Sequence, residues 1–229
     1  MYGGVELHKG IEGLILGPMI ILAIGGLLGV AGYNVEADPG YYYPGYSEYK
    51  SWGCAGVSGS VLVTNPAPVS GSGDAHCMLI GFSNFDFFAI GWVEGQTPWG
   101  STGTAQRFYW DAVCWGIYQG ALLTTATVNT WHTFKLNYIL GSLNTWTCYL
   151  DGVAKKTLQF TNRVGVPVSQ FEVHDNEDVI SGHVKTLQYA LASGRIIRWY
   201  AWDGYGVTDS DPPYQMTIIS NTEWTCAGP

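Results

Sequence analysis

The sequence predicts a mainly β protein, an antiparallel β-sandwich preceded by one N-terminal hydrophobic helix. Three observations support this prediction. Short apolar or alternating runs rich in Val, Ile, Thr, Tyr, Phe and Trp recur between Gly-bounded turns, as strands do. No stretch after residue 35 sustains a helical period of about 3.6 residues beyond a turn or two. Residues 13–35, in contrast, form a continuous run without a charged side chain.

We divide the chain into residues 1–35, a hydrophobic helix, residues 36–50, a linker rich in Tyr, Pro and Gly, and residues 51–229, the sandwich. The linker holds five tyrosines, which we expect to pack on the sandwich. Charged residues are 12% of the chain, against a usual share of about 25%, and aromatic residues are 14%. That combination fits large buried rings and a surface made polar by Ser, Thr, Asn and Gly.

About twelve strands are expected after the linker, enough for two antiparallel sheets that pack face to face. They are Gly59–Thr64, His76–Phe82, Phe87–Val93, Gln106–Ala112, Trp115–Gln119, Thr130–Tyr138, Thr145–Leu150, Lys155–Phe160, Gln170–Val173, His183–Leu191, Ile196–Trp202 and Tyr214–Ser220.

The apolar run Gly13–Val35 has 23 residues. As a helix it would be about 34 Å long, enough to cross a hydrocarbon layer of about 30 Å. Three interpretations stay open. A cleavable secretory signal would use the small residues around Ala31 as its cleavage site. A retained membrane anchor would place the sandwich outside the cell, because Lys9 is the only Lys or Arg before Lys50.

The third interpretation is the stalk of a filament subunit. The segment resembles the N-terminal helix of type IV pilin-like and archaellin-like proteins, because Lys9-Gly10 precedes an apolar helix with one early acid, Glu12. Bacterial pilins carry that Glu five residues after the Gly, whereas Glu12 is the second. Gly25 and Gly29 have the spacing that lets two helices approach closely. A stalk implies copies of the chain as partners through these two glycines, and a plain anchor implies membrane lipid.

The sharpest local pattern is a strand from Trp131 to Tyr138, followed by a second strand that ends in Asp151-Gly152. Gly152 accepts the positive φ that a tight hairpin requires. Alternation in the first strand buries His132, Phe134, Leu136 and Tyr138.

This unit resembles the concanavalin A-like lectin/glucanase superfamily, in which a Trp-His-x-Phe strand precedes a strand that ends in a Tyr-x-Asp-Gly turn. The resemblance implies a jelly-roll-like sandwich. Because the superfamily includes lectins, glycosidases, glutamic peptidases and structural modules, it leaves the function open.

The cysteines predict disulfides and no metal site, because no Cys-x-x-Cys pair and no zinc-like Cys/His spacing occurs. In an exported protein, one or two disulfides are expected. We predict Cys54–Cys226, which would join the first and last strands, and then Cys77–Cys114. Cys148 lies in a strand pattern and is expected to act as a small buried apolar residue.

Two enzymatic chemistries have candidate residues. A glycosidase needs two carboxylates about 5 to 9 Å apart across a cleft, and the nearest segment is Glu172–Asp178, although the Glu-x-Asp-x-x-Glu spacing of the resembled glucanases is absent. A glutamic peptidase needs a Gln and a Glu on the concave face to activate water. Residues available for that pair are Gln106, Gln119, Glu94 and Glu172. If the chain is an enzyme, the expected catalytic residues are Glu172, Glu177 and Glu94.

Two binding chemistries also have candidates. Exposed aromatic rings stack on the apolar faces of sugars, although most Trp in a sandwich lie in the core. The candidate rings are Trp99, Trp110, Trp115, Trp199 and Trp202. A loop with Asp203, Asp209 and Asp211 could hold Ca²⁺ through its carboxylates, and no other cofactor is expected.

From these patterns we expect a non-catalytic structural or adhesive protein of the cell surface. Its sandwich would be displayed on the hydrophobic helix, either as a filament subunit or as a membrane-anchored, lectin-like module that contacts surface glycans. The alternative is a secreted or anchored hydrolase of the same superfamily, a glycosidase or a glutamic peptidase. The net charge of −8 and the absence of a basic block argue against nucleic acid as a partner.

Overall fold

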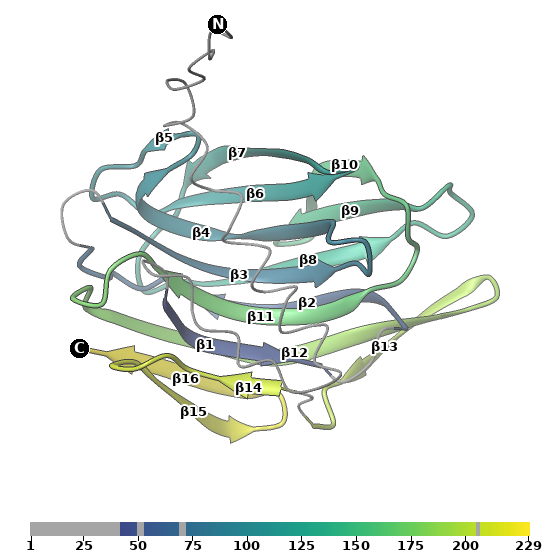
Figure 1. The fold of residues 1–229 in the computed structure, drawn as a ribbon. Coiled ribbons are helices and arrows are strands. Elements are labelled where there is room, and N and C mark those ends of the chain that lie inside the picture. Colours follow the sequence, from purple (N-terminus) through teal and green to yellow (C-terminus); the bar gives the residue numbers. More distant parts are fainter. Residues whose placement is uncertain (1–41, 50–52, 69–71, 205–206) are drawn as a thin grey trace, which may run out of the picture.

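The computed structural model describes residues 42–49, 53–68, 72–204 and 207–229. Over these residues the chain forms sixteen strands, and they contain no helix. The strands build two antiparallel sheets that pack face to face (Figure 1). The described residues therefore confirm an all-β sandwich, and they hold no helix of the length and apolarity that a bilayer crossing needs.

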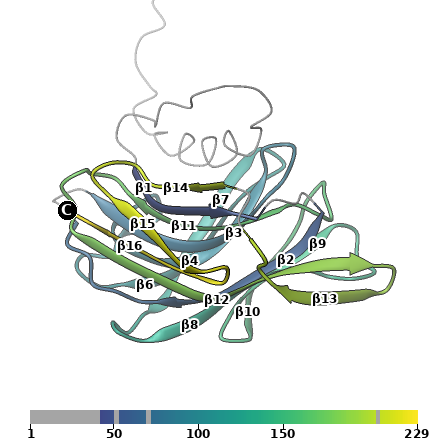
Figure 2. The ribbon, with the colours of Figure 1, turned by 90° about the horizontal axis from the view of Figure 1, so that it is seen from below.

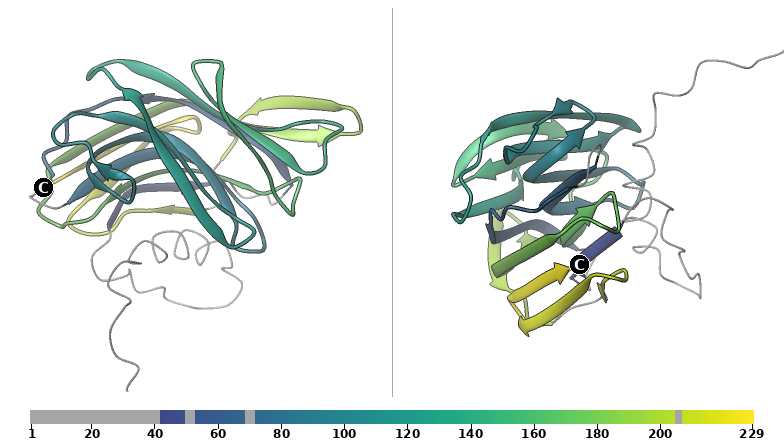
Figure 3. Two further views of the ribbon diagram at one scale, coloured as in Figure 1. Left: turned by 90° about the horizontal axis from the view of Figure 1, so that it is seen from above. Right: turned by 90° about the vertical axis from the view of Figure 1, so that its left-hand side faces the viewer.

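We name the two sheets A and B. Sheet A has the order β14 (Val207–Asp209), β1 (Tyr42–Glu48), β11 (Val166–Val173), β3 (Gly73–Gly81), β4 (Phe87–Thr97), β6 (Arg107–Cys114) and β7 (Ile117–Thr125), with β5 (Gly100–Ser101) paired to β4. Sheet B has the order β10 (Val153–Gln159), β9 (Thr145–Leu150), β8 (Trp131–Tyr138), β2 (Cys54–Leu62), β12 (Ile180–Ser193), β16 (Glu223–Gly228) and β15 (Gln215–Ser220), with β13 (Ile196–Ala201) paired to β12. The hairpin of β12 and β13 projects beyond the rest of sheet B (Figures 2 and 3).

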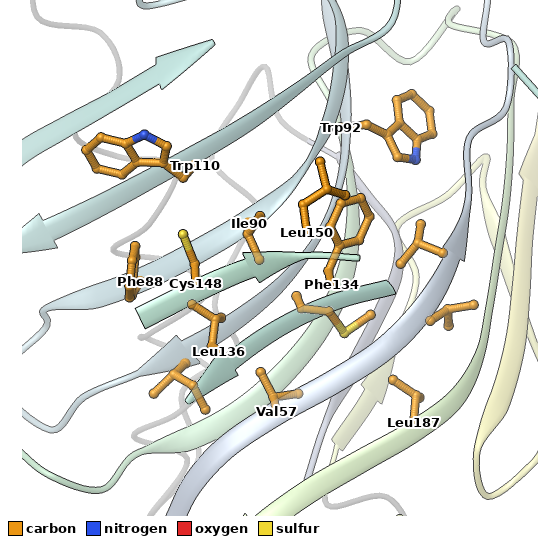
Figure 4. Close-up of a cluster of buried hydrophobic side chains, with 14 of the residues drawn as sticks. Val57, Phe88, Ile90, Trp92, Trp110, Phe134, Leu136, Cys148, Leu150 and Leu187 are labelled. Carbon is orange, nitrogen blue, oxygen red and sulfur yellow. The ribbon is translucent and has the colours of Figure 1, made fainter. Parts of the chain in front are cut away.

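The main hydrophobic core lies between the sheets. Its largest fully buried side chains include Trp92, Trp146, Trp202 and Trp224. Figure 4 shows side chains from both sheets that point toward one another in this core. Because successive strand residues point to opposite faces, each core residue fixes its neighbour on the outer face of its sheet.

The strand and turn that carry the superfamily resemblance are tied together by hydrogen bonds. Phe134 and Leu136 are fully buried, as the alternation predicts. Asp151 and Gly152 have φ values of 51° and 79°, the geometry that a two-residue hairpin requires. One carboxylate oxygen of Asp151 accepts a hydrogen bond from the Thr133 backbone N–H at 2.8 Å, and the other lies 2.7 Å from Nδ1 of His132.

All twelve predicted strands overlap observed strands, and Thr145–Leu150 coincides with β9. The predicted linker was partly wrong, because residues 42–48 form β1 inside sheet A. A register shift between Tyr42 and Gly45 lets the chain pass Pro44 and still pair with β11. The short strands β5, β14 and β16 were also not predicted.

Neither predicted disulfide forms, because all five cysteines are free and buried. Cys54 pairs with Leu191 of β12, whereas Cys226 pairs with Gly182 of the same strand. Leu191 and Gly182 are roughly 30 Å apart along β12, whereas the Cα atoms of a disulfide are 4.4–6.8 Å apart.

The second predicted pair is separated by a sheet. Cys77 belongs to the apolar cluster on the outer face of sheet A, and Cys114 belongs to the core between the sheets. Burial raises the pKa of the Cys114 thiol to about 11, and burial also raises the pKa of the Cys77 thiol. Both thiols therefore stay protonated and unreactive at neutral pH.

The predicted N-terminal helix, residues 1–35, lies outside the described residues. The same holds for Gly25 and Gly29, its predicted helix-contact positions. The signal, anchor and stalk interpretations therefore stay predictions.

We predict that Asp151→Ala destabilises the sandwich by about 1–2 kcal/mol, because it leaves the Thr133 N–H without its acceptor and removes a residue type that tolerates positive φ. Asp151→Asn keeps an acceptor oxygen and that tolerance, so it is the matched control and should lose less. Urea unfolding followed by tryptophan fluorescence measures both. Equal stabilities for the two variants would contradict this account of the turn.

Candidate functional site

The outer face of sheet A, which is turned away from sheet B, is one part of the molecule where polar groups gather among buried apolar residues. Phe171 of β11 and Trp110 of β6 belong to the core. Their neighbours Gln170, Glu172 and Asp111 therefore point to the outer face. All three are nearly or fully buried, with exposed fractions of 1%, 8% and 8%.

The strand register places Gln170 and Tyr109 at the same level of sheet A. Gln170 is paired with Cys77, Cys77 with Gly91, and Gly91 with Tyr109. A Cβ atom on Gly91 would lie 2.2 Å from the His76 carbonyl oxygen, so only Gly fits there. With no side chain at Gly91, the Tyr109 hydroxyl reaches the Cys77 thiol and forms a hydrogen bond with it.

A small pocket lies on this face. We call it the carboxyl pocket; among its lining residues are Ala75, Trp99, Tyr109, Asp111, Glu172 and His174. Its volume of about 40 Å³ is room for about three water molecules at 10–15 Å³ each. Two acidic side chains from strands on either side of β3 and β4 thus meet one small, water-sized space.

Both acids of the pocket are held with raised proton affinity. Burial, and then the charge of Asp111, raise the pKa of Glu172 to about 8, although a hydrogen bond from the Gln170 side-chain amide to Oε1 of Glu172 opposes the shift. Burial raises the pKa of Asp111 to about 7, opposed by a 3.2 Å hydrogen bond from the Tyr118 hydroxyl. Both carboxyl groups therefore hold a proton more tightly in the fold than in water, and each can exchange a proton near neutral pH. Such a pair can give and accept a proton in one reaction.

His174 also lines the pocket, at the end of β11. Burial lowers its pKa, against the opposing charge of Asp178. The imidazole is therefore neutral near and above pH 7, and it brings no positive charge to the pocket.

A second Glu–Gln pair lies inside the sandwich. Glu94 follows Trp92 on the inner face of β4, and the Gln106 side-chain amide donates a hydrogen bond to Oε2 of Glu94. The same amide donates to Asn65 at 3.1 Å. Both members of the pair are 3% exposed, and burial raises the pKa of Glu94. Two of the residues proposed for a glutamic peptidase thus do meet, but on the face that looks toward sheet B.

Next to that pair, two buried aspartates face each other. Asp74 of β3 and Asp178 of the segment before β12 are both fully buried. No N–H or hydroxyl group is bonded to either oxygen of Asp74, and its carboxyl neighbour is Asp178. Ser72 donates a 2.5 Å hydrogen bond to the Asp178 carboxylate. Two facing carboxyl groups can bond only when one is protonated, and burial, then the charge of Asp178, raise the pKa of Asp74 to about 9.

The other predicted site residues do not gather. Glu177 is exposed on the loop before β12. Gln119 lies on β7 opposite Ala112, whose side chain belongs to the core face of sheet A. Of the acids predicted for an enzyme, only Glu172 lies in the carboxyl pocket.

The predicted sugar-binding tryptophans form no common platform. Trp110 and Trp202 lie in the core, Trp199 lies near Lys135 on sheet B, and Trp115 is 60% exposed at the β6–β7 turn. Only Trp99 lines the carboxyl pocket. The five rings therefore belong to four separate environments.

The predicted calcium loop of Asp203, Asp209 and Asp211 lies only partly within the described residues, so it stays a prediction. Asp203 accepts a 2.9 Å hydrogen bond from the Tyr49 hydroxyl. Within the ranges that the structure describes, no three His, Cys, Asp or Glu side chains lie close enough to hold a metal ion. The side chain of Asp209 is outside that description.

Sequence reasoning missed Asp111 and Gln170. Each had a signal, because a carboxylate or an amide follows or precedes large apolar residues within a strand pattern that predicts burial. In Tyr109-Trp110-Asp111-Ala112 and Ser169-Gln170-Phe171, a buried polar group needs a partner or a function. The pairing of β11 with β3 and of β4 with β6, which the sequence does not display, places the two on one face.

Comparison with solved structures identifies the fold. The chain is similar to scytalido-glutamic peptidase with a peptide-based transition-state analogue, with a TM-score of 0.58 and 9% identity over 84% of this chain and 100% of that one. It is also similar to a second eqolisin-family peptidase, SCP-B with a bound tripeptide (TM-score 0.49, 10% identity, 84% and 100% covered). A β-glucanase of Bacillus licheniformis matches with a TM-score of 0.35 and 16% identity over 54% of each chain. No protein-family model and no curated protein sequence matches the chain.

The fold is the concanavalin A-like lectin/glucanase jelly roll, as the Trp-His-x-Phe and Asp-Gly unit suggested. The low identities mean that the likeness concerns the fold and not the chemistry. The chemistry has to be argued from the carboxyl pocket itself.

We predict that the protein loses stability as the pH rises above neutral. Asp74, Glu172 and Asp111 have folded-state pKa values of about 9, 8 and 7, all above the ordinary values of 3.8 and 4.5. A raised folded-state pKa stabilises the fold fully below the ordinary value, and that stability is lost as pH rises through the folded-state value. The melting temperature should therefore fall between about pH 7 and 9; below about pH 6.5 the neutral His76, whose pKa burial lowers to about 3, acts in the opposite direction.

The Asp74 contribution can be isolated with Asp74→Asn, which offers an N–H donor to Asp178 and cannot ionise. Its melting temperature should fall less steeply from pH 7 to 9 than that of the parent protein. Glu177→Gln, on the exposed loop nearby, is the control and should keep the parent slope. A parent melting temperature that rises over this range would contradict the assignment of the buried acids.

Proposed function

We propose that this protein is a hydrolase that cleaves peptide bonds by general acid–base catalysis at Asp111 and Glu172. The observation that carries the proposal is the carboxyl pocket, whose lining includes two buried carboxyl groups with pKa values raised toward neutral pH. A purely structural sandwich gains nothing from such a pair, because burying acids costs free energy unless they are well paired. Because of this pair, we favour the hydrolase alternative over the non-catalytic role that was predicted from the sequence.

The proposed reaction uses one acid in each protonation state. The ionised member removes a proton from a water molecule, whose oxygen forms a bond to the substrate carbonyl carbon. The protonated member gives its proton to the leaving nitrogen as the C–N bond breaks. Gln170 holds Oε1 of Glu172 through its side-chain amide and thereby positions that carboxyl group.

Peptide is the substrate class that we favour over polysaccharide. A Gln and a Glu side by side on one sheet face is the pair that the sequence argument required of a glutamic peptidase, and Gln170 and Glu172 provide it. The solved structure with the TM-score of 0.58 is a peptidase with a peptide-based analogue, which shows that this sandwich fold can carry a peptidase site.

The location and assembly stay as predicted from the sequence. We propose an extracellular or cell-surface hydrolase whose sandwich is joined to an apolar N-terminal run. Copies of the chain or membrane lipid remain its proposed partners through that run, and surface glycans are a proposed contact. All five thiols are free, so disulfides do not support an extracellular location.

We predict that Glu172→Gln and Asp111→Asn each lower kcat/KM on an unstructured protein such as casein by about 10²–10⁴-fold, because each removes one partner of the proton transfer. The pH profile of the parent protein should be bell-shaped, with limbs near 7 and 8 from the two carboxyl groups. Release of acid-soluble peptides measures both.

Glu94→Gln is the matched control, since it alters the second Glu–Gln pair and leaves the carboxyl pocket unchanged. It should keep activity within a fewfold of the parent. Loss of activity in Glu94→Gln with full activity in Glu172→Gln would move the reaction to the inner pair. No hydrolysis of casein by the parent protein would end the peptidase proposal, and hydrolysis of a β-glucan in its place would favour a glycosidase.

A further inference from the structure

Trp99 lies across the outer face of sheet A beside the carboxyl pocket. It stands at the tip of the β4–β5 hairpin, where the Thr97 hydroxyl donates to the Gly100 carbonyl at 2.5 Å and accepts from the Trp99 N–H at 3.2 Å. Its ring is stacked with Tyr109 at 5.7 Å and with Tyr118 at 6.0 Å between centroids. The indole is half-buried, so part of it remains open to an incoming molecule.

The strand beneath the indole is shaped for it. A Cβ atom on Gly120 of β7 would lie 2.2 Å from the indole ring of Trp99, closer than any real contact. The φ of Gly120 is not in the left-handed region, so its backbone does not itself require glycine. Close approach of the indole is therefore the reason that this position has no side chain.

Trp99 and the two acids line the same space. Apolar or aromatic walls are formed by Ala75, Val93 and the ring of Tyr109, and the uncharged polar residues Gln96 and Thr97 also line the pocket. None of the described lining residues is Lys or Arg. Burial of an apolar substrate side chain on this surface would be favourable. An acidic substrate side chain would instead lie near two carboxyl groups, with no cation to balance its charge.

We propose that Trp99 determines substrate specificity at this site by packing against an apolar or aromatic side chain next to the scissile bond. This inference rests on the proposed peptidase function, because it concerns the same pocket. The β4–β5 hairpin carries neither of the two catalytic acids. In this inference it determines which peptide bond is cleaved.

Cleavage-site mapping tests the inference. A proteome-derived peptide mixture is digested with the parent protein and with Trp99→Ala, Trp99→Phe and Gly120→Ala, and the cut sites are read by mass spectrometry. The parent should cut beside apolar and aromatic residues and avoid Asp and Glu. Trp99→Ala should still cut but lose at least about tenfold of that preference, a typical value for one lost apolar contact. Trp99→Phe should retain most of it.

Gly120→Ala is the decisive variant, because it keeps the indole and displaces it from its place on β7. It should shift the preference in the direction of Trp99→Ala. Trp131→Ala, which removes an exposed indole from sheet B, should leave the preference unchanged. Melting temperatures of all variants show that each is folded before digestion.

The outcomes separate the two proposals. A parent protein that cuts no peptide defeats the proposed function and the inference with it. A parent that cuts, together with Trp99→Ala and Gly120→Ala variants of unchanged preference, overturns the inference alone. The inference is supported if all variants stay folded, if Trp99→Ala and Gly120→Ala lose the cleavage preference, and if Trp99→Phe keeps it.

Discussion

Burial of large aromatic rings between the two sheets is the interaction on which the other features depend. Trp92, Trp146 and Trp224 are fully buried there, and each aromatic side chain contributes roughly 150–250 Å² of buried surface. Since side chains alternate along a strand, burying Phe171 places Gln170 and Glu172 on the outer face. A slip of one residue in β11 would put both acid and amide into the core, so the rings also hold the proposed site in place.

The sequence predicted the strands well where a strand is buried on one face and bounded by turns. β9 and the Asp151-Gly152 turn are examples, because alternation and a residue that accepts positive φ are both local signals. β1 was missed because Pro44 and Gly45 interrupt its pattern, and its pairing with β11 depends on a bulge and on the rest of sheet A.

The candidate site was predicted only in part, because its residues meet through pairing between distant strands. Glu172 was a candidate from its own segment, but Asp111 lies 61 positions earlier and no local motif links the two. Gln106 and Glu94 were both among the candidates, but the sequence did not pair them, and alternation placed their pair inside the sandwich. The disulfides failed for the same reason: chain position does not reveal that Cys54 and Cys226 lie at different ends of β12.

The buried acids have a further consequence for the charge of the molecule. The formal net charge of −8 counts every Asp and Glu as ionised, whereas Asp74 and Glu172 stay neutral in the fold at pH 7. The folded chain therefore carries about two fewer negative charges than its composition indicates, and it should focus above the isoelectric point of 4.9 calculated from the sequence. Folding takes these protons up from the solvent, so the measured enthalpy of unfolding will include the ionisation heat of whichever buffer receives them.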